Sequence, residues 1–310
     1  MSQQQKFAEA MTTKYSSSIE LWAQQTKAVT EGLCIEDTEA GTENKSEDFY
    51  GLTTMRKKTT RNADLTGSEI NMRRRWVFSE PYYNRITVDS VDKVRLRVDP
   101  ATGIAEAQMA AAMRTKDQIF ISAAIGTAYT GKTFSTPVTL PAGGTLPDAN
   151  AGFTLTKFDD AVAYLKRYGQ MVPGDRIWCL WTQAEEKLFG NQLQVGSKDY
   201  TSISYRDKGE IDKYGLVDFR RLEDVYDEDG NLLERMLPYG VGTGTGGANT
   251  RTVLMGVKKA IKRWSPKSAS GYVFFYGRAD EYDIVTTLDC GAARRLDRGI
   301  VAATCITTDA

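Results

Sequence analysis

Residues 49–92 restrict the fold more than any other part of this chain. They read "FYGLTTMRKKTTRNADLTGSEINMRRRWVFSEPYYNRITVDSVD", with two β-rich halves around a centre of turn-forming residues. This pattern predicts a long two-stranded hairpin. A two-stranded ribbon has little core of its own and is only marginally stable alone in water. It must therefore lie on another surface, either as a basic solvated loop of its own molecule or as an arm that grips a neighbour.

Charge is distributed unevenly around this hairpin. Residues 31–48 hold seven acidic residues and one lysine, whereas residues 55–75 hold seven basic residues and two acids. This separation predicts that the acidic arm of one subunit contacts the basic hairpin of another, although solvation of both segments is an open alternative because exposed ion pairs are weak. The residues expected at the contact are Arg56, Lys57, Lys58, Arg61, Arg73, Arg74 and Arg75 on the hairpin and Glu36, Asp37 and Glu39 on the arm.

The composition argues against an enzyme. The chain of 310 residues contains no histidine, which excludes Ser-His and Cys-His nucleophiles and His-based metal sites. Four scattered cysteines form no C-x-x-C pair, so no zinc or redox motif is indicated. Lys+Arg and Asp+Glu are both 40, so no global charge attracts nucleic acid or a membrane. We expect no catalytic residue, cofactor or metal, and no membrane span or secretion signal.

One short motif argues for the opposite conclusion. "GTAYTGKT" at residues 126–133 fits the phosphate-loop pattern, in which a strand precedes the loop and a helix follows it. Here the preceding residues, rich in Ala, Met and Gln, predict one helix over 100–126 with an approximate stripe at Ala105, Met109, Met113, Phe120 and Ala124. The following residues contain three prolines and cannot begin a useful helix. We therefore interpret the motif as a loop that terminates a helix, and Lys132 and Thr133 as non-catalytic.

Other segments predict a mixed α+β chain. "KFDDAVAYLKRY" and "TQAEEKLFG" favour helices, whereas "DRIWCLW" and "YGLVDFRRL" favour buried strands. Near the C-terminus, "YDIVTTLD" and "GIVAATCITTD" flank a predicted turn, "CGAARRLDRG". Arg294, Arg295 and Arg298 in that turn indicate a solvated face or a protein contact rather than a nucleic-acid site.

The order of these elements resembles the major capsid proteins of tailed bacteriophages, which have the HK-ninety-seven-type fold. The most specific segments are "DSVDKVRLRVDPATGIAEAQMAAAMRTKDQIFISAAIGTAYTGKT", "IWCLWTQAEEKLFGN" and "KGEIDKYGLVDFRRL". The resemblance covers about residues 16–307. It implies that the phosphate-loop match is a family feature unrelated to ATP.

The resemblance implies a division of the chain into five parts. Residues 1–47 would be an N-terminal arm and residues 48–88 an extended loop that reaches across a neighbouring subunit. Residues 89–156 and 269–310 would form a peripheral domain that includes a spine helix at 100–126. Residues 157–268 would form an axial domain.

The resemblance also implies partners and a location. The chain would assemble with itself into hexamers and pentamers of an icosahedral shell, with a scaffolding protein, a portal and in some cases a decoration protein. Double-stranded DNA would lie non-specifically against the inner face. Assembly would take place in the host bacterial cytoplasm. Three alternatives stay open: an encapsulating shell protein of the same fold, a tail or decoration protein, and a P-loop nucleotide-binding protein.

Overall fold

The fold is that of a computed structural model, which describes residues 27–39, 44–51, 53–58, 61, 67–70, 72–90, 100–131, 135–192, 210–227, 229–241, 249–277 and 280–307. Residues 16–30, where serines and the apolar Ile19, Leu21, Trp22 and Val29 predict a short helix, lie mostly outside these described residues. Among the described helices, none is long and apolar enough to cross a membrane.

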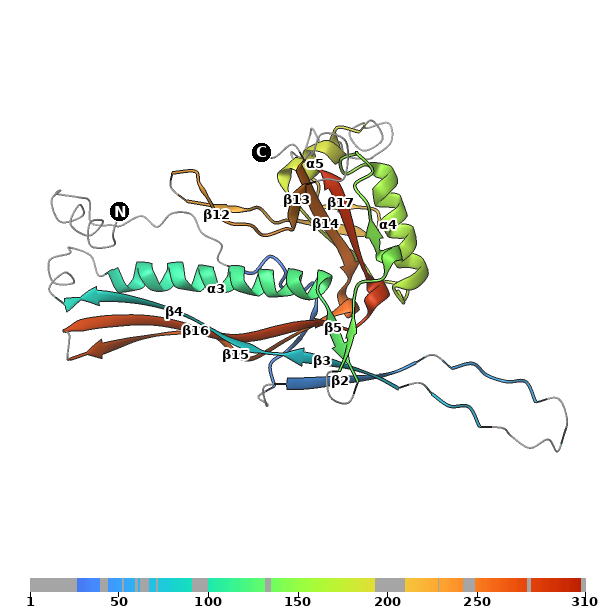
Figure 1. The fold of residues 1–310 in the computed structure, drawn as a ribbon, viewed down its shortest axis with the longest axis horizontal. Helices are drawn as coiled ribbons and strands as arrows, with labels where there is room; N and C mark the ends of the chain where they lie inside the picture. Colours follow the sequence, from blue (N-terminus) through green and yellow to red (C-terminus); the bar gives the residue numbers. More distant parts are fainter. Residues whose placement is uncertain are drawn as a thin grey trace.

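A long four-stranded sheet and one long helix form the elongated half of the molecule (Figure 1). The sheet has the order β1 (Ile35–Asp37), β15 (Ile261–Tyr276), β16 (Glu281–Arg294) and β4 (Glu80–Asp89). β15, β16 and β4 are antiparallel, whereas β1 runs parallel to β15. Helix α3 (Pro100–Ile125) lies along one face of this sheet. The helix predicted over 100–126 is therefore confirmed.

Helix α3 ends where the sequence predicts, at Gly126. The Gly126 amide donates to the carbonyl of Ser122 at 2.7 Å, and a Cβ at this position would lie 2.5 Å from the same oxygen. Only glycine fits without a shift of the backbone. The expected apolar stripe is only partly correct. Phe120 and Ala124 are fully buried, whereas the stripe residues of the N-terminal half are half-buried. That half meets the sheet through the neighbouring Gln108 and Ala112 instead.

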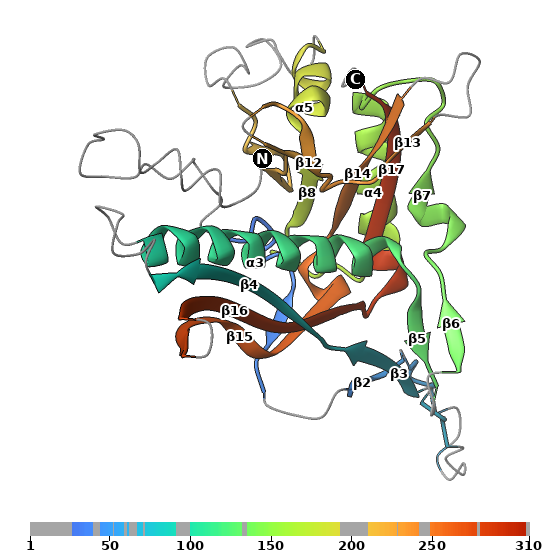
Figure 2. The same ribbon diagram turned by 60° about the vertical axis from the view of Figure 1, so that its left-hand side comes forward.

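The second half of the molecule is built on a seven-stranded mixed sheet, which Figure 2 shows standing above α3. Its strands, in spatial order, are β7 (Thr145–Leu146), β17 (Ile300–Ile306), β14 (Asn249–Val257), β8 (Ile177–Trp181), β10 (Val217–Arg221) and β9 (Lys213–Tyr214), with β13 (Tyr239–Val241) paired to β14. Two helices accompany it, α4 (Leu155–Tyr168) and α5 (Gln183–Gly190). The helices predicted in "KFDDAVAYLKRY" and "TQAEEKLFG" are therefore confirmed as α4 and α5. The strands predicted in "DRIWCLW" and "YGLVDFRRL" are confirmed as β8 and β10.

The main core lies between this sheet and the C-terminal half of α3. All five residues of β8, "IWCLW", are buried because neighbouring strands and helices cover both faces of the sheet. Trp181 stacks on Phe219 with ring centroids 4.1 Å apart, and Phe120 packs edge-on against Trp178 at 5.2 Å. α3 thereby joins the two halves, since its C-terminal residues Phe120, Ile121 and Ala124 belong to the same core cluster.

A hairpin is present, but only its second strand lies where it was predicted: the first strand is at residues 44–50, and residues 53–58 of the predicted first half form no strand. The two strands belong to a separate four-stranded sheet with the order β2 (Asn44–Tyr50), β3 (Met72–Phe78), β5 (Ala128–Thr130) and β6 (Thr136–Val138). The β2–β3 register runs from Asn44 opposite Phe78 to Tyr50 opposite Met72. The chain then passes into β4, which pairs with β16 in the long sheet. The remaining described elements are the hairpin of β11 (Val225–Tyr226) and β12 (Leu232–Glu234) and the single-turn helices η1 (Ala142–Gly144), η2 (Lys258–Ala260) and η3 (Asp297–Gly299).

The turn predicted over residues 290–299 is largely wrong. β16 continues through Cys290 to Arg294, and the reversal into β17 is made by the short η3 helix. Arg294 is fully buried rather than solvated. The strand continues because Gly291 allows β16 to cross the base of β3: a Cβ there would lie 1.7 Å from the Phe78 carbonyl oxygen.

Candidate assembly surfaces

In the described part of the chain, the hairpin is fixed to the rest of the molecule near its base. β5 pairs with β3 through Arg75 and Trp76, opposite Thr130 and Tyr129. The Trp76 indole Nε1 donates to the Gly131 carbonyl at 2.7 Å. The chain that leaves α3 therefore folds back onto the base of the hairpin. Beyond this base, the described residues 53–58 and 67–70 form no strand, and all of them are exposed.

A buried charged cluster lies under the same base. Arg75 and Arg294 both pair with the carboxylate of Asp297, and Arg294 Nε lies 3.0 Å from Asp297 Oδ1. Arg294 also donates to the carbonyls of Ala124, Gly126 and Val138, at 2.8–3.1 Å. The two arginines are 4% and 0% exposed. This cluster ties the hairpin to the end of α3 and to the turn before β17.

The seven basic residues expected at an intersubunit contact do not lie in one kind of environment. Arg75 is buried in the cluster just described, where it pairs with Asp297 of its own chain. Arg74 is half-buried and forms a bidentate ion pair with Asp48 of β2, with N–O distances of 2.6 and 2.7 Å. The hydrogen bonds from Arg74 lower the pKa of Asp48. The others are exposed on or near the projecting part of the hairpin: Arg56, Lys57, Lys58, Arg61 and Arg73.

The acidic residues expected on the arm lie beside β15 of the same subunit. Glu36 pairs with Arg263 at 2.5 Å, and Asp37 pairs with Lys262 at 3.0 Å. The backbone carbonyl of Glu39 accepts a hydrogen bond from the Trp264 indole at 2.8 Å. Glu36 and Asp37 thus have basic partners within their own chain, which the sequence pattern did not indicate.

The start of the described arm is bound to α3 by a buried carboxylate. Asp117 accepts hydrogen bonds from the amides of Val29 and Thr30, at 3.0 and 2.9 Å, and from the Thr30 hydroxyl at 2.7 Å. Arg263 donates to the same hydroxyl at 2.9 Å. The arm is therefore held between α3 and the long sheet from Val29 onward.

The face of the long sheet opposite α3 is covered near the hairpin base, where Val77 packs against Trp264 and Ala293, and is exposed toward the free end of β15. Thr286 donates to Gln108 of α3 at 2.9 Å, so Thr286 points toward the helix and its neighbour Val285 points away. Directly paired residues share a face, which places Tyr272, Phe274 and Tyr276 of β15 on the outer side with Val285. These aromatic side chains are 42–55% exposed, and Tyr83 of β4, opposite Thr287, is 80% exposed.

This outer face also carries acidic groups. Asp283 and Glu281 alternate with Val285 along β16, and Asp89 lies opposite Glu281. Asp283 is paired with Arg85 at 2.7 Å. Among the described residues, β15 is an edge strand beyond Trp264, because β1 pairs only with residues 262–264. An exposed aromatic stripe on an edge strand is a typical interaction surface. Its sequence signal is the unbroken apolar run "YVFFY", which does not alternate as a strand with one solvated face would.

The phosphate-loop motif does not have the surroundings that nucleotide binding needs. Helix α3 precedes the loop, as predicted, and the residues after it form β6 rather than a helix. Lys132 and Thr133 themselves lie outside the described residues. No group of three or more acidic or cysteine side chains suited to a metal ion is present within the described ranges.

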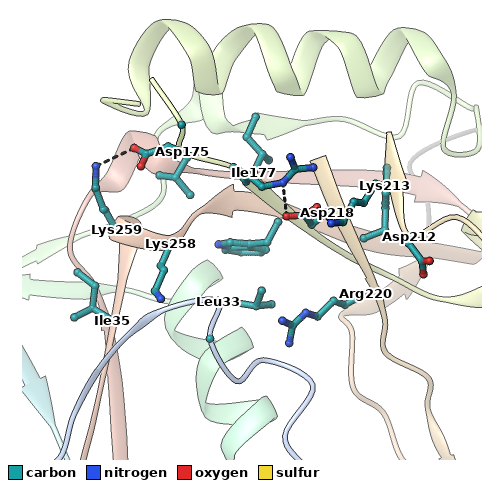
Figure 3. A pocket seen from close by; sticks show the side chains of 16 residues that line it. Leu33, Ile35, Asp175, Ile177, Asp212, Lys213, Asp218, Arg220, Lys258 and Lys259 are labelled. Carbon is teal, nitrogen blue, oxygen red and sulfur yellow. Dashed lines mark hydrogen bonds and ion pairs between the residues drawn. The ribbon is translucent and has the colours of Figure 1, made fainter. Parts of the chain in front are cut away.

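A cleft of about 770 Å³ opens between the arm and the seven-stranded sheet (Figure 3). Leu33 and Ile35 of the arm, together with Trp178 of β8, form its apolar floor, and the charged residues around them form its rim. Sequence reasoning did not predict this cleft, because its walls come from four separate segments. The projecting hairpin and the exposed aromatic face are typical of a protein that binds other chains.

Comparisons with known proteins identify the family to which the chain belongs. The model of the phage capsid protein family matches residues 7–306. Among solved structures, the cyanophage Pam1 capsid has a TM-score of 0.71 at 7% identity, covering 96% of this chain and 97% of that chain. The capsid of Ralstonia phage GP4 has a TM-score of 0.70 at 13% identity, covering 96% and 95%. The capsid of cyanophage P-SCSP1u has a TM-score of 0.69 at 15% identity, covering 96% and 94%. No curated protein sequence matches the chain.

The chain belongs to the phage capsid protein family. The structural likenesses, at identities this low, establish the fold, which is the HK-ninety-seven-type α+β capsid fold that the sequence predicted. The protein is thus a structural component of a virion shell, and the prediction of a capsid protein is confirmed.

Proposed function

We propose that this protein is the repeating subunit of an icosahedral shell, and that its basic hairpin reaches across a neighbouring subunit in each hexamer and pentamer. The observation that carries the proposal is the projecting hairpin. Its described outer residues, 53–58 and 67–70, are exposed and form no strand. A segment of this kind gains order only by lying on another chain.

The neighbour's receiving surface is the outer face of the long sheet. Its exposed aromatic side chains supply apolar area, and Glu281 and Asp89 supply negative charge opposite the hairpin's lysines and arginines. The hairpin and the free end of β15 lie at opposite ends of the molecule in Figure 1. A contact between two different surfaces is heterologous, so repeating it by rotation produces a closed ring.

The contact between the acidic arm of one subunit and the hairpin of another stays a prediction. Because Glu36 and Asp37 already pair with Arg263 and Lys262, a neighbouring hairpin would have to share these carboxylates. We therefore assign the larger electrostatic role to the sheet face. The five-part division at residues 47, 88, 156 and 268 likewise stays a proposal. The structure of β4, which joins the long sheet from residue 80, favours an earlier end for the extended loop.

The remaining parts of the function rest on the family. We propose a scaffolding protein and a portal as assembly partners, a decoration protein as an optional one, and double-stranded DNA held non-specifically on the inner face. Assembly would take place in the host cytoplasm. The subunit needs no catalyst for this role, and we propose that it has none.

Charge reversal on the hairpin tests the proposed contact. Lys57→Glu with Lys58→Glu changes two exposed lysines on the projecting segment. We expect a folded subunit that forms no closed shells by electron microscopy. The matched control is Lys166→Glu with Lys187→Glu, two exposed lysines on α4 and α5. If both pairs assemble equally well, the hairpin does not contact its neighbour through these charges.

Two further measurements separate the alternatives. The contents of particles purified from infected cells distinguish a viral shell, which holds DNA, from an encapsulating shell, which holds a cargo protein. ATP turnover and magnesium-ATP binding test the nucleotide alternative. Saturable micromolar binding that is lost in Lys132→Ala would contradict a non-catalytic loop.

A further inference from the structure

The cleft beside the arm has the composition of a peptide-binding site. Its floor is apolar, with Leu33 and Ile35 from the arm and Trp178 from β8. Its rim is charged, with five basic and three acidic side chains among the lining residues. Figure 3 shows Lys258 and Ile35 on one side, Leu33 and Arg220 below, and Asp212 on the far side. Apolar lining that can cover a ligand is typical of binding sites, and the charged rim would select the charge of the occupant.

The charges at the rim are not balanced equally on all sides. Arg176 pairs with Asp218 at 2.6 Å, and Lys259 pairs with Asp175 at 2.8 Å. Lys258 has no acidic partner within the described part of the chain. Arg220 binds only backbone carbonyls among the described residues. The side of the cleft that carries Lys258 therefore favours a negative group on its occupant.

A segment with a carboxylate between apolar side chains would match both the apolar floor and the Lys258 side of the cleft. Such a segment is present in this chain at residues 18–22, "SIELW", where Glu20 stands between Ile19 and the pair Leu21 and Trp22. Trp and Leu are large enough to cover the apolar floor, and Trp is frequent among anchor residues at interfaces.

The connection to the cleft is short enough for this segment to reach it. Arg220, a lining residue, donates to the carbonyl of Val29 at 2.6 Å and of Glu31 at 2.8 Å. Val29 therefore lies at the rim. The seven residues from Trp22 to Val29 span at most about 25 Å when extended. A tether of this length gives an effective concentration of about 1 mM or more, which favours docking within one subunit.

We propose that residues 19–22 of this chain dock into the cleft of the same subunit. The side chains of Ile19, Leu21 and Trp22 cover the apolar floor, and the Glu20 carboxylate pairs with Lys258. The arm then has a second attachment point besides Asp117. The proposal does not depend on shell assembly, so it can be tested on the unassembled subunit.

Disulfide trapping in the full chain tests the position of the segment. Glu20→Cys with Lys258→Cys is expected to form an intrachain disulfide under mild oxidation, detected by peptide mapping in a mass spectrometer. The matched control is Glu9→Cys with Lys258→Cys, which uses the other acidic residue of the first 26. The four native cysteines are buried and contribute little background. A yield no higher than the control overturns the proposal, and a disulfide found only between chains shows that a second copy is the occupant and also overturns it.

Peptide binding supplies an independent test that does not rely on oxidation. A fluorescent peptide of residues 16–26, "SSSIELWAQQT", is titrated into the full chain that carries Leu21→Ala and Trp22→Ala, with circular dichroism as the check on folding. We expect saturable binding, with an affinity about fivefold lower when Lys258→Glu is added to the protein. A peptide that carries Glu20→Lys should bind the Lys258→Glu protein more tightly than the native peptide does. Absence of binding to the folded variant, or binding unaffected by Lys258→Glu, contradicts the proposal.

Discussion

Arg75 at the base of the hairpin and Asp297 in the turn before β17 form a buried ion pair across 222 residues of sequence. Arg294 binds the same carboxylate, so one acid compensates two buried guanidinium groups. Removing the acid leaves two buried arginines without this counter-charge, which is costly for the folded state. Asp297 therefore contributes both to the orientation of the hairpin base and to the stability of the subunit.

Asp297→Asn is expected to reduce the free energy of unfolding by about 3–5 kcal/mol, measured by urea denaturation of the unassembled subunit. The matched control is Asp48→Asn, which breaks the exposed pair with Arg74. We expect no measurable loss of stability from the control, because exposed pairs contribute little. Equal effects of the two substitutions would show that the buried cluster has no special role.

Asp117→Ala is expected to release the arm from α3 without unfolding the core. Three donors, the amides of Val29 and Thr30 and the Thr30 hydroxyl, lose their acceptor. Hydrogen exchange of the Val29 and Thr30 amides should accelerate by at least about tenfold, since a loss of about 1.4 kcal/mol in the free energy of local opening raises the exchange rate tenfold. Amides in β8 and β14 should keep their protection. Unchanged exchange at residues 29 and 30 would mean that another contact holds the arm.

Gly291→Ala is expected to prevent folding of the base of the hairpin. The added Cβ would lie 1.7 Å from the Phe78 carbonyl oxygen, and both atoms belong to backbone segments that cannot move independently. The expected loss of stability is at least about 3 kcal/mol, seen as a lower urea midpoint or as insoluble protein. Gly67→Ala is the control, because nothing lies within 4 Å of its added Cβ. Normal solubility and an unchanged midpoint for Gly291→Ala would contradict this packing.

Cys34 is expected to make the subunit less stable at alkaline pH. Burial raises the pKa of the Cys34 thiol from 9.0 to about 11. The folded state therefore keeps the proton that the unfolded state loses, and the stability contributed by this group is complete below pH 9.0 and falls as the pH rises toward 11. The full effect of such a shift is about 2–3 kcal/mol.

Urea unfolding of the wild type and of Cys34→Ala between pH 8 and pH 11 checks this dependence, with the pH range set by the two pKa values. The loss of stability across that range should be smaller in Cys34→Ala. The native thiol should also react slowly with iodoacetamide at pH 8, because little thiolate is present. Parallel stability curves for the two proteins, together with rapid alkylation of native Cys34, would contradict a raised pKa.

The sequence by itself determined the local elements and the class of the protein. Helix α3 was predictable because Ala, Met and Gln favour a helix and Gly126 must end it, both of which are local effects. Strand β3 of the hairpin was predictable because a β-rich run follows the turn-forming residues, whereas β2 lies at residues 44–50, mostly before the predicted segment. The absence of histidine and the order of the elements indicated a structural rather than a catalytic chain.

Only the tertiary structure decided which charges are available at the surface. Arg73, Arg74 and Arg75 are identical in sequence terms, yet one is exposed, one pairs with Asp48 and one is buried beside Asp297. Burial of Arg294, the crossing at Gly291 and the cleft beside the arm likewise depend on segments far apart in the chain. The physical reason is that alternation along a strand fixes which residues share a face. The free energy of each charge depends on which distant groups lie next to that face.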